Sequence, residues 1–173
     1  MNKSRLYALI GLAALLVGAG VISAAASNNT EYTRGDEVLQ PNQRISSNLR
    51  FSPGQDGINS GDTMTWVHAD KTLAPHTVTL ATADELVGSF DDFLFCAECA
   101  AAIGAALAGH FPDEFTVVPV LDPDGDGQFD SPGDSMLFFA GQTISAEINN
   151  AAGETLYYFC AIHPWMQGTI DVN

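Results

Sequence analysis

The sequence predicts an all-β fold, an antiparallel Greek-key β-sandwich that carries a helix-containing insertion. Two observations predict it. Short runs rich in β-branched and aromatic residues recur from residue 45 to the C-terminus, separated by Gly, Pro, Asn and Asp. One alanine-rich stretch interrupts this rhythm between about residues 88 and 135. Many short strands with turn signals between them are typical of a sandwich of two sheets.

The N-terminal stretch predicts export. Lys3 and Arg5 precede an uncharged apolar run over residues 6–22, and a small-residue cleavage site follows at residues 24–26. The run is also long enough to cross a bilayer, so residues 1–26 are expected to be a signal peptide or an N-terminal membrane anchor, with 6–22 as the tether. The polar, aperiodic residues 27–44 are expected to form a flexible linker. The remainder is expected outside the cytoplasm.

From residue 45 onward, each strand candidate is a β-rich run bounded by turn residues. The sandwich domain is therefore expected to occupy residues 45–173, with an insertion at about 88–135 between two of its strands. The strand candidates are residues 45–51, 62–69, 76–82, 115–121, 135–141, 143–149, 155–162 and 168–172.

The insertion predicts one short helix over CAECAAAIGAALAGH, because alanine favours helices and its apolar residues are four apart. Asp91 and Asp92, just before it, suit the positive end of a helix dipole. Cys96 and Cys99 form a C-x2-C pair at its start, which fits a disulfide, a redox-active dithiol, a secondary copper site or inert thiols. Export favours the disulfide.

The segment DPDGDGQFDSPGD resembles a calcium-binding loop, because oxygen ligands alternate along it and a glycine at the sixth position permits the sharp turn. The glutamate that closes such loops at the twelfth position is absent. Two interpretations stay open: calcium binds here and stabilises the insertion as a structural clamp, or the acidic turn binds nothing. The candidate ligands are Asp122, Asp124, Asp126, Gln128 and Asp130.

Near the C-terminus, YYFCAIHPWMQGTIDV places Cys160, His163 and Met166 at a C-x2-H-x2-M spacing. With one more imidazole, this thiolate, imidazole and thioether complete the ligand group of a blue copper site. His76 in LAPHTVTL is the candidate for that imidazole and comes from a separate strand. A buried Cys or Met alone usually only packs, and a lone His is seldom a ligand. Together the four residues predict one bound copper ion.

The same segments resemble the cupredoxins. The C-terminal loop is similar to the copper loop of amicyanin-type members, with the same short spacing and a proline after the histidine. The stretch GDTMTWVHADKTLAPHTVTL resembles the family's G-D-x-V-x-W-x-N…P-H-N-V stretch. The resemblance covers residues 45–82 and 135–173, and omits the insertion. It implies three equatorial ligands with an axial thioether, namely His76, Cys160 and His163 with Met166.

Two positions depart from the family pattern. Thr77 stands where the family has an asparagine whose side chain ties the copper loop, so the resemblance leaves that role open, whereas the Thr77 backbone N–H can still support the cysteine sulfur. His68 replaces another asparagine. It is either a surface histidine on a strand or a titrating group that makes the reduction potential pH-dependent. The resemblance also implies that Pro164 and Trp165 lie beside the surface-reaching ligand histidine, where they dock redox partners or shield the loop.

The net charge and the four predicted copper ligands restrict the functions that this protein can have. Without the N-terminal segment, four basic residues face 21 acidic ones, a charge near −17 that repels nucleic acid and anionic lipid. Four protein ligands leave no copper position for a substrate. The sequence therefore predicts an electron carrier between redox protein partners outside the cytoplasm, and not an enzyme. The alternatives are a copper-handling protein, a small copper oxidoreductase with a second metal in the insertion, and a calcium-bound surface domain.

Overall fold

The computed structural model describes residues 29–173 of the 173-residue chain. The signal or anchor predicted over residues 1–26 lies outside the described residues and stays a prediction. Across residues 29–173, no helix is both long and apolar enough to cross a membrane.

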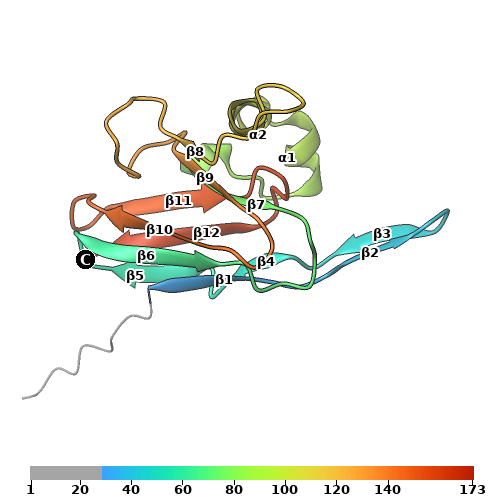
Figure 1. Ribbon diagram of the computed structural model, residues 1–173, viewed down its shortest axis with the longest axis horizontal. Coiled ribbons are helices and arrows are strands. Elements are labelled where there is room, and N and C mark those ends of the chain that lie inside the picture. The colour runs from blue at the N-terminus through green and yellow to red at the C-terminus, as the bar shows by residue number, and fades with distance from the viewer. Residues whose placement is uncertain (1–28) are drawn as a thin grey trace, which may run out of the picture.

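Two packed sheets form the body of the protein (Figure 1), and the predicted β-sandwich with a helical insertion is confirmed. Neighbouring strands are antiparallel except for two parallel pairs, β1 with β6 and β5 with β12. The four-stranded sheet has the order β10 (Thr143–Ile148), β6 (Asp62–Val67), β1 (Thr30–Arg34) and β4 (Arg50–Ser52). The six-stranded sheet has the order β5 (Gln55–Ile58), β12 (Gln167–Val172), β11 (Thr155–Phe159), β7 (His76–Ala81), β9 (Ser135–Phe138) and β8 (Val120–Leu121).

The predicted flexible linker over residues 27–44 is wrong from residue 30 onward. Strand β1 joins the four-stranded sheet between β6 and β4, while β2 (Glu37–Gln40) and β3 (Arg44–Ser47) form a hairpin that projects from one end of the sandwich (Figure 1). In β1 the residues that alternate into the interior are Glu31 and Thr33, both buried. A period-two pattern carried by polar side chains lacks the hydrophobic alternation that identifies a strand in sequence.

The insertion contains more structure than one helix. After the 3-10 turn Ala83–Glu85, helix α1 (Phe90–Phe95) begins at the N-cap Ser89, whose hydroxyl accepts a hydrogen bond from the Asp92 N–H at 3.1 Å. Asp91 and Asp92 therefore lie in the first turn of α1. The predicted alanine-rich helix is confirmed as α2 (Ala97–His110). The strand predicted over 115–121 is reduced to β8, because the residues before it are mostly exposed.

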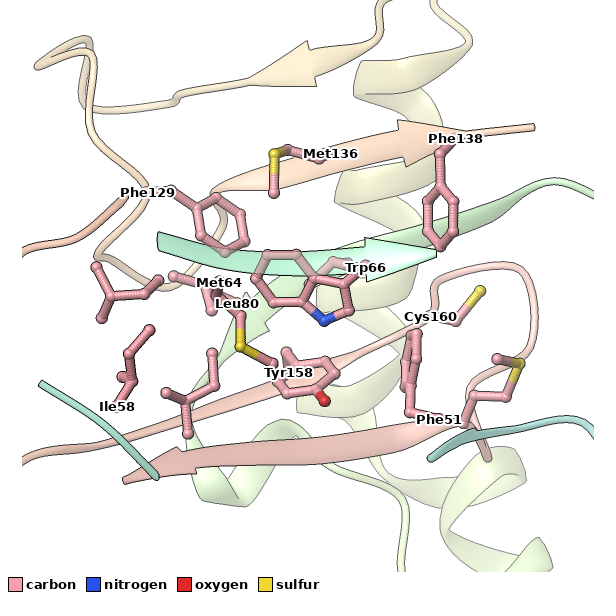
Figure 2. Close-up of a cluster of buried hydrophobic side chains, with 14 of the residues drawn as sticks. Phe51, Ile58, Met64, Trp66, Leu80, Phe129, Met136, Phe138, Tyr158 and Cys160 are labelled. Carbon is pink, nitrogen blue, oxygen red and sulfur yellow. The ribbon is translucent and has the colours of Figure 1, made fainter. Parts of the chain in front are cut away.

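Aromatic rings fill the space between the sheets (Figure 2). Trp66 packs edge to face on Phe129 and on Tyr158, with centroids 5.9 Å apart in both pairs, and Phe51 meets Tyr158 at 5.0 Å. Cys160 lies at one end of this cluster (Figure 2). The core therefore anchors the strand that leads into the predicted copper loop.

A second, smaller core lies on the opposite face of the six-stranded sheet, under α2 (Figure 1). Phe159 and Ala161 pack there against Ala106 and Ala81, because their side chains alternate with the inward-facing Tyr158 and Cys160. All six residues of β7 are consequently buried, although most strands of a sandwich have one wet face.

Candidate metal centre

The structure brings His76, Cys160 and His163 together at one end of the sandwich. His76 is the first residue of β7, and Cys160 directly follows β11. Two backbone hydrogen bonds close the loop between β11 and β12: the Cys160 N–H donates to the Met166 carbonyl at 2.9 Å, and the Met166 N–H to the His163 carbonyl at 2.8 Å. His76, Cys160 and Met166 are fully buried, and His163 is 5% exposed.

The three donor atoms form a nearly regular triangle. The Cys160 Sγ lies 3.7 Å from Nδ1 of His76 and 3.7 Å from Nδ1 of His163, and the two Nδ1 atoms are 3.2 Å apart. The point equidistant from all three lies about 2.1 Å from each, close to the lengths of first-row metal bonds to nitrogen and sulfur. The triangle therefore has the size of a trigonal metal site, and its donors are those of blue copper.

Asp70 orients the first histidine, a role that no sequence pattern assigns to it. Its Oδ2 accepts a hydrogen bond from Nε2 of His76 at 2.8 Å, which leaves the Nδ1 lone pair directed at the triangle. Burial opposes ionisation of Asp70, but hydrogen bonds from Thr33 and Thr72 outweigh it and lower the pKa of the carboxyl to about 2. A carboxylate behind a ligand imidazole is a common way to set its tautomer and basicity.

Both imidazoles are neutral near pH 7. Burial lowers the pKa of His76 to about 4, although the Asp70 charge opposes this shift. Burial also lowers the pKa of His163, against the opposing charges of Glu37 and Asp70. Neutral rings keep their lone pairs available, as a metal ligand requires.

The cysteine is held ready for a metal but is protonated without one. Burial raises the pKa of the Cys160 thiol, and the hydrogen bond from the Thr77 N–H to its Sγ, 3.4 Å long, opposes this only in part. A bound cation deprotonates a coordinating thiol, so a metal ion at this position would convert Cys160 to the thiolate.

Thr77 also ties the metal loop, the role that the family resemblance left open. Its Oγ1 accepts a hydrogen bond from the Ala161 N–H at 2.7 Å, across 84 positions of sequence. The backbone N–H and the hydroxyl of one residue thus hold Cys160 and the residue that follows it.

The outer side of the site is formed by His163 and its neighbours. Its ring packs edge to face on Trp165 at 5.4 Å, and its Nε2 lies 3.7 Å from a carboxylate oxygen of Glu37 in the projecting hairpin. Trp165 is 48% exposed, whereas Pro164 is buried. Only Trp165 of the predicted docking pair is therefore open to a partner.

His68 is not a surface histidine. It is buried behind the first ligand, with its ring 4.9 Å from that of His76 and 6.0 Å from that of Phe138. Its Nε2 donates to the Ala74 carbonyl at 2.9 Å, and its Nδ1 lies 3.7 Å from Asp70. His68 thus packs behind the ligand and its carboxylate partner.

Cys96 and Cys99 form a disulfide at the start of α2, as export predicts. This pairing removes both thiols as metal ligands in the insertion. The insertion's histidine, His110, has both ring nitrogens occupied, by the Val118 carbonyl and the Ser135 hydroxyl. In the part of the chain that the structure describes, the soft and imidazole ligands needed for a second copper in the insertion are therefore engaged elsewhere.

The acidic loop gathers Asp122, Asp124 and Asp126, whose carboxylate oxygens lie within 4.8 Å of one another. These carboxylates already accept hydrogen bonds from backbone N–H groups within the loop. The Gln128 side-chain amide donates to Asp126 at 3.0 Å, and Asp130 lies outside the cluster. Calcium binding here stays a prediction.

No family model and no curated protein matches the chain. Solved structures do match. A purple cupredoxin from Nitrosopumilus maritimus matches with a TM-score of 0.43 and 15% identity over 83% of this chain and 98% of its own. Auracyanin A, a blue copper protein from Chloroflexus aurantiacus, matches with a TM-score of 0.45 and 17% identity over 83% of this chain and 98% of its own. A copper(I) amicyanin variant matches with a TM-score of 0.39 and 14% identity over 87% of this chain and 88% of its own.

Because each of these TM-scores lies below 0.5, the family resemblance rests on the sandwich and the donor set of this chain. Two neutral imidazoles and a buried cysteine form a metal-sized triangle, and a buried methionine closes the same loop. The chain therefore has a cupredoxin-like β-sandwich with the His–Cys–His–Met arrangement typical of a type 1 copper site.

Proposed function

We propose that this protein binds one copper ion at His76, Cys160, His163 and Met166 and carries single electrons between redox proteins outside the cytoplasm. The triangle of Nδ1, Nδ1 and Sγ atoms supports this proposal most directly, because its size and donors suit a trigonal copper site. Bound copper would supply a one-electron Cu(I)/Cu(II) couple.

The protein's own groups suit electron transfer better than catalysis. Burial of all four ligands excludes water and substrate from the metal. Asp70 fixes the His76 ring, and Thr77 fixes the sulfur and the loop, so the ligands have little freedom to rearrange when the charge changes. A rigid and closed donor set favours a carrier over a copper oxidoreductase.

Trp165 supports a docking role for the surface around His163. Its exposed ring contacts this ligand and offers a short path from the surface to the metal. The chain carries a formal net charge of −15, which favours redox partners with a cationic surface and disfavours nucleic acid. Export by the N-terminal segment, with cleavage or retention as a tether, completes this proposal.

The acidic loop would add a calcium clamp on the insertion. The three clustered carboxylates support it, and their internal hydrogen bonds and the missing closing glutamate weigh against it.

The deciding experiment loads the purified protein with Cu(II) and records its visible and electron-paramagnetic spectra with metal counting. An intense thiolate-to-copper band at one copper per chain is expected, and Cys160→Ser should remove the band. The absence of the band from the wild-type protein, or two coppers per chain, would overturn the proposal. Voltammetry separates the copper-handling alternative, because a carrier keeps its metal through repeated oxidation and reduction whereas a delivery protein releases it.

A further inference from the structure

Three hydroxyl side chains lie in a row on the face of the six-stranded sheet that α2 covers. Thr77 and Thr79 are two positions apart in β7 and so share one face, and Ser135 is the direct cross-strand neighbour of Thr79. Each of the three is at most 2% exposed. Without α2 such hydroxyls would bind water, and beneath it they require protein partners.

The hydroxyls form one continuous chain of hydrogen bonds. The chain begins at the Ala161 N–H and ends at His110, the last residue of α2. Successive contacts measure 2.7 Å (Ala161 N to Thr77 Oγ1), 3.0 Å (Thr77 to Thr79), 2.7 Å (Thr79 to Ser135) and 2.7 Å (Ser135 to Nε2 of His110). His110 then reaches the Val118 carbonyl through Nδ1 at 2.6 Å.

The two ends determine the direction of every bond. A carbonyl only accepts, so Nδ1 of His110 carries the hydrogen, and Nε2 of a neutral ring must accept from Ser135. The Ser135 hydrogen is then used, so Thr79 donates to Ser135, and by the same reasoning Thr77 donates to Thr79. The Thr77 oxygen remains free to accept from the Ala161 N–H, which only donates.

His110 is suited to this terminal position. Burial lowers the pKa of its imidazole, which keeps the ring neutral and Nε2 an acceptor. The Val118 N–H also donates to the His110 carbonyl at 2.9 Å, so two hydrogen bonds hold the ring and backbone against the segment that leads into β8. The far end of the chain is thus anchored between α2 and the sheet.

We propose that His110 is a positioning residue for the metal loop, acting through the relay Ser135–Thr79–Thr77 on the peptide that follows Cys160. The relay ends on Thr77, whose hydroxyl holds Ala161 and whose backbone N–H holds the Cys160 sulfur. Aligned hydrogen bonds polarise and orient one another, so a change at His110 alters the hydrogen bond that Thr77 accepts from the metal loop. The insertion thereby sets the geometry of the sulfur ligand, an inference that rests on the proposed copper function.

The first test needs no copper. In the metal-free protein, 15N NMR should show His110 as the neutral Nδ1–H tautomer. His110→Phe keeps a ring of similar size but removes the acceptor, and Ser135→Ala breaks the chain with a smaller change. Either variant should accelerate hydrogen exchange of the Ala161 amide about tenfold, the loss expected when one hydrogen bond is weakened by about 1.4 kcal/mol.

Thr65→Val is the matched control. Its hydroxyl pairs with the exposed Ser145 at 3.0 Å on the other sheet, so this variant removes a solvent-facing hydroxyl–hydroxyl hydrogen bond without touching the relay. Ala161 exchange within twofold of wild type in every folded relay variant would overturn the proposal, because His110 would then only fasten its own loop. Should His110→Phe fail to fold, Ser135→Ala alone decides.

The second test uses the copper-loaded protein. The relay variants should shift the thiolate-to-copper band and the reduction potential, while Thr65→Val leaves both at wild-type values. Faster Ala161 exchange with unchanged band and potential would overturn the link to the metal. Absence of the band from the wild-type protein would instead refute the copper function, and Ala161 exchange would then decide the relay on its own.

Discussion

Glu31 is a buried carboxyl whose ionisation should make the stability of this protein fall with rising pH. It is fully buried in β1, where the Gly54 N–H donates to its Oε1 at 2.6 Å, and no hydrogen bond from the described residues reaches its Oε2. Burial raises the pKa of this carboxyl from 4.5 to about 7; the Gly54 hydrogen bond opposes the shift and the nearby charge of Asp56 reinforces it.

The size and sign follow from proton linkage. Between about pH 4.5 and pH 7 the unfolded chain has lost the Glu31 proton while the folded protein keeps it, so the free energy of unfolding falls as the pH rises. At 1.36 kcal/mol for each pH unit the full loss would be about 3.4 kcal/mol. Part of the Glu31 pKa shift comes from the charge of Asp56, which is only half-buried and is screened by solvent. We therefore expect a smaller loss in the free energy of unfolding, of about 2 kcal/mol.

Urea unfolding at pH 5, 6, 7 and 8 measures this loss in wild type and in Glu31→Gln, whose amide imitates the protonated acid. The variant should match wild type near pH 5 and exceed its stability by about 2 kcal/mol at pH 8. Glu147→Gln removes an exposed charge from the same sheet and is the control for net charge. Parallel stability profiles for wild type and Glu31→Gln across this range would refute the reasoning.

Three further predictions concern packing, the site and the acidic loop. Gly168→Ala should lower the free energy of unfolding by about 1–3 kcal/mol, because a new Cβ would collide with the buried Tyr158 ring. Gly104→Ala should instead raise it by up to about 1 kcal/mol, because this glycine lies inside α2 with open space around it. Thermal unfolding of both variants checks the contrast. Asp70→Asn keeps the shape of the carboxylate behind the first ligand histidine but not its charge, and should weaken copper binding about 10- to 100-fold in a competition titration with a chelator; unchanged affinity would refute the orienting role. Calcium should raise the melting temperature of chelated wild-type protein but not of Asp122→Asn, and no rise in wild type would eliminate the clamp.

Local patterns were enough to predict much of the sandwich and the metal loop. Cys160, His163 and Met166 fall within seven residues, so one turn of the chain brings them together whatever surrounds it. The alanine-rich α2 was equally predictable from the sequence, because helix propensity depends on neighbouring residues. Strand β1 was missed because Glu31 and Thr33 occupy its interior positions. Their burial depends on Gly54 and on the loop after β6, which meet β1 only in the folded protein.

The side chains that can bind a metal are therefore evident from the amino-acid sequence, since donor chemistry belongs to the residue and close spacing forces proximity. How these side chains are held depends on contacts that form only when the chain folds. Asp70 became the partner of His76, and Thr77 the tie for Ala161, because sheet register and loop closure set which atoms come within hydrogen-bond distance. The relay to His110 arises for the same reason. Its hydroxyls are ordinary strand residues until α2 excludes water and obliges them to bond to one another.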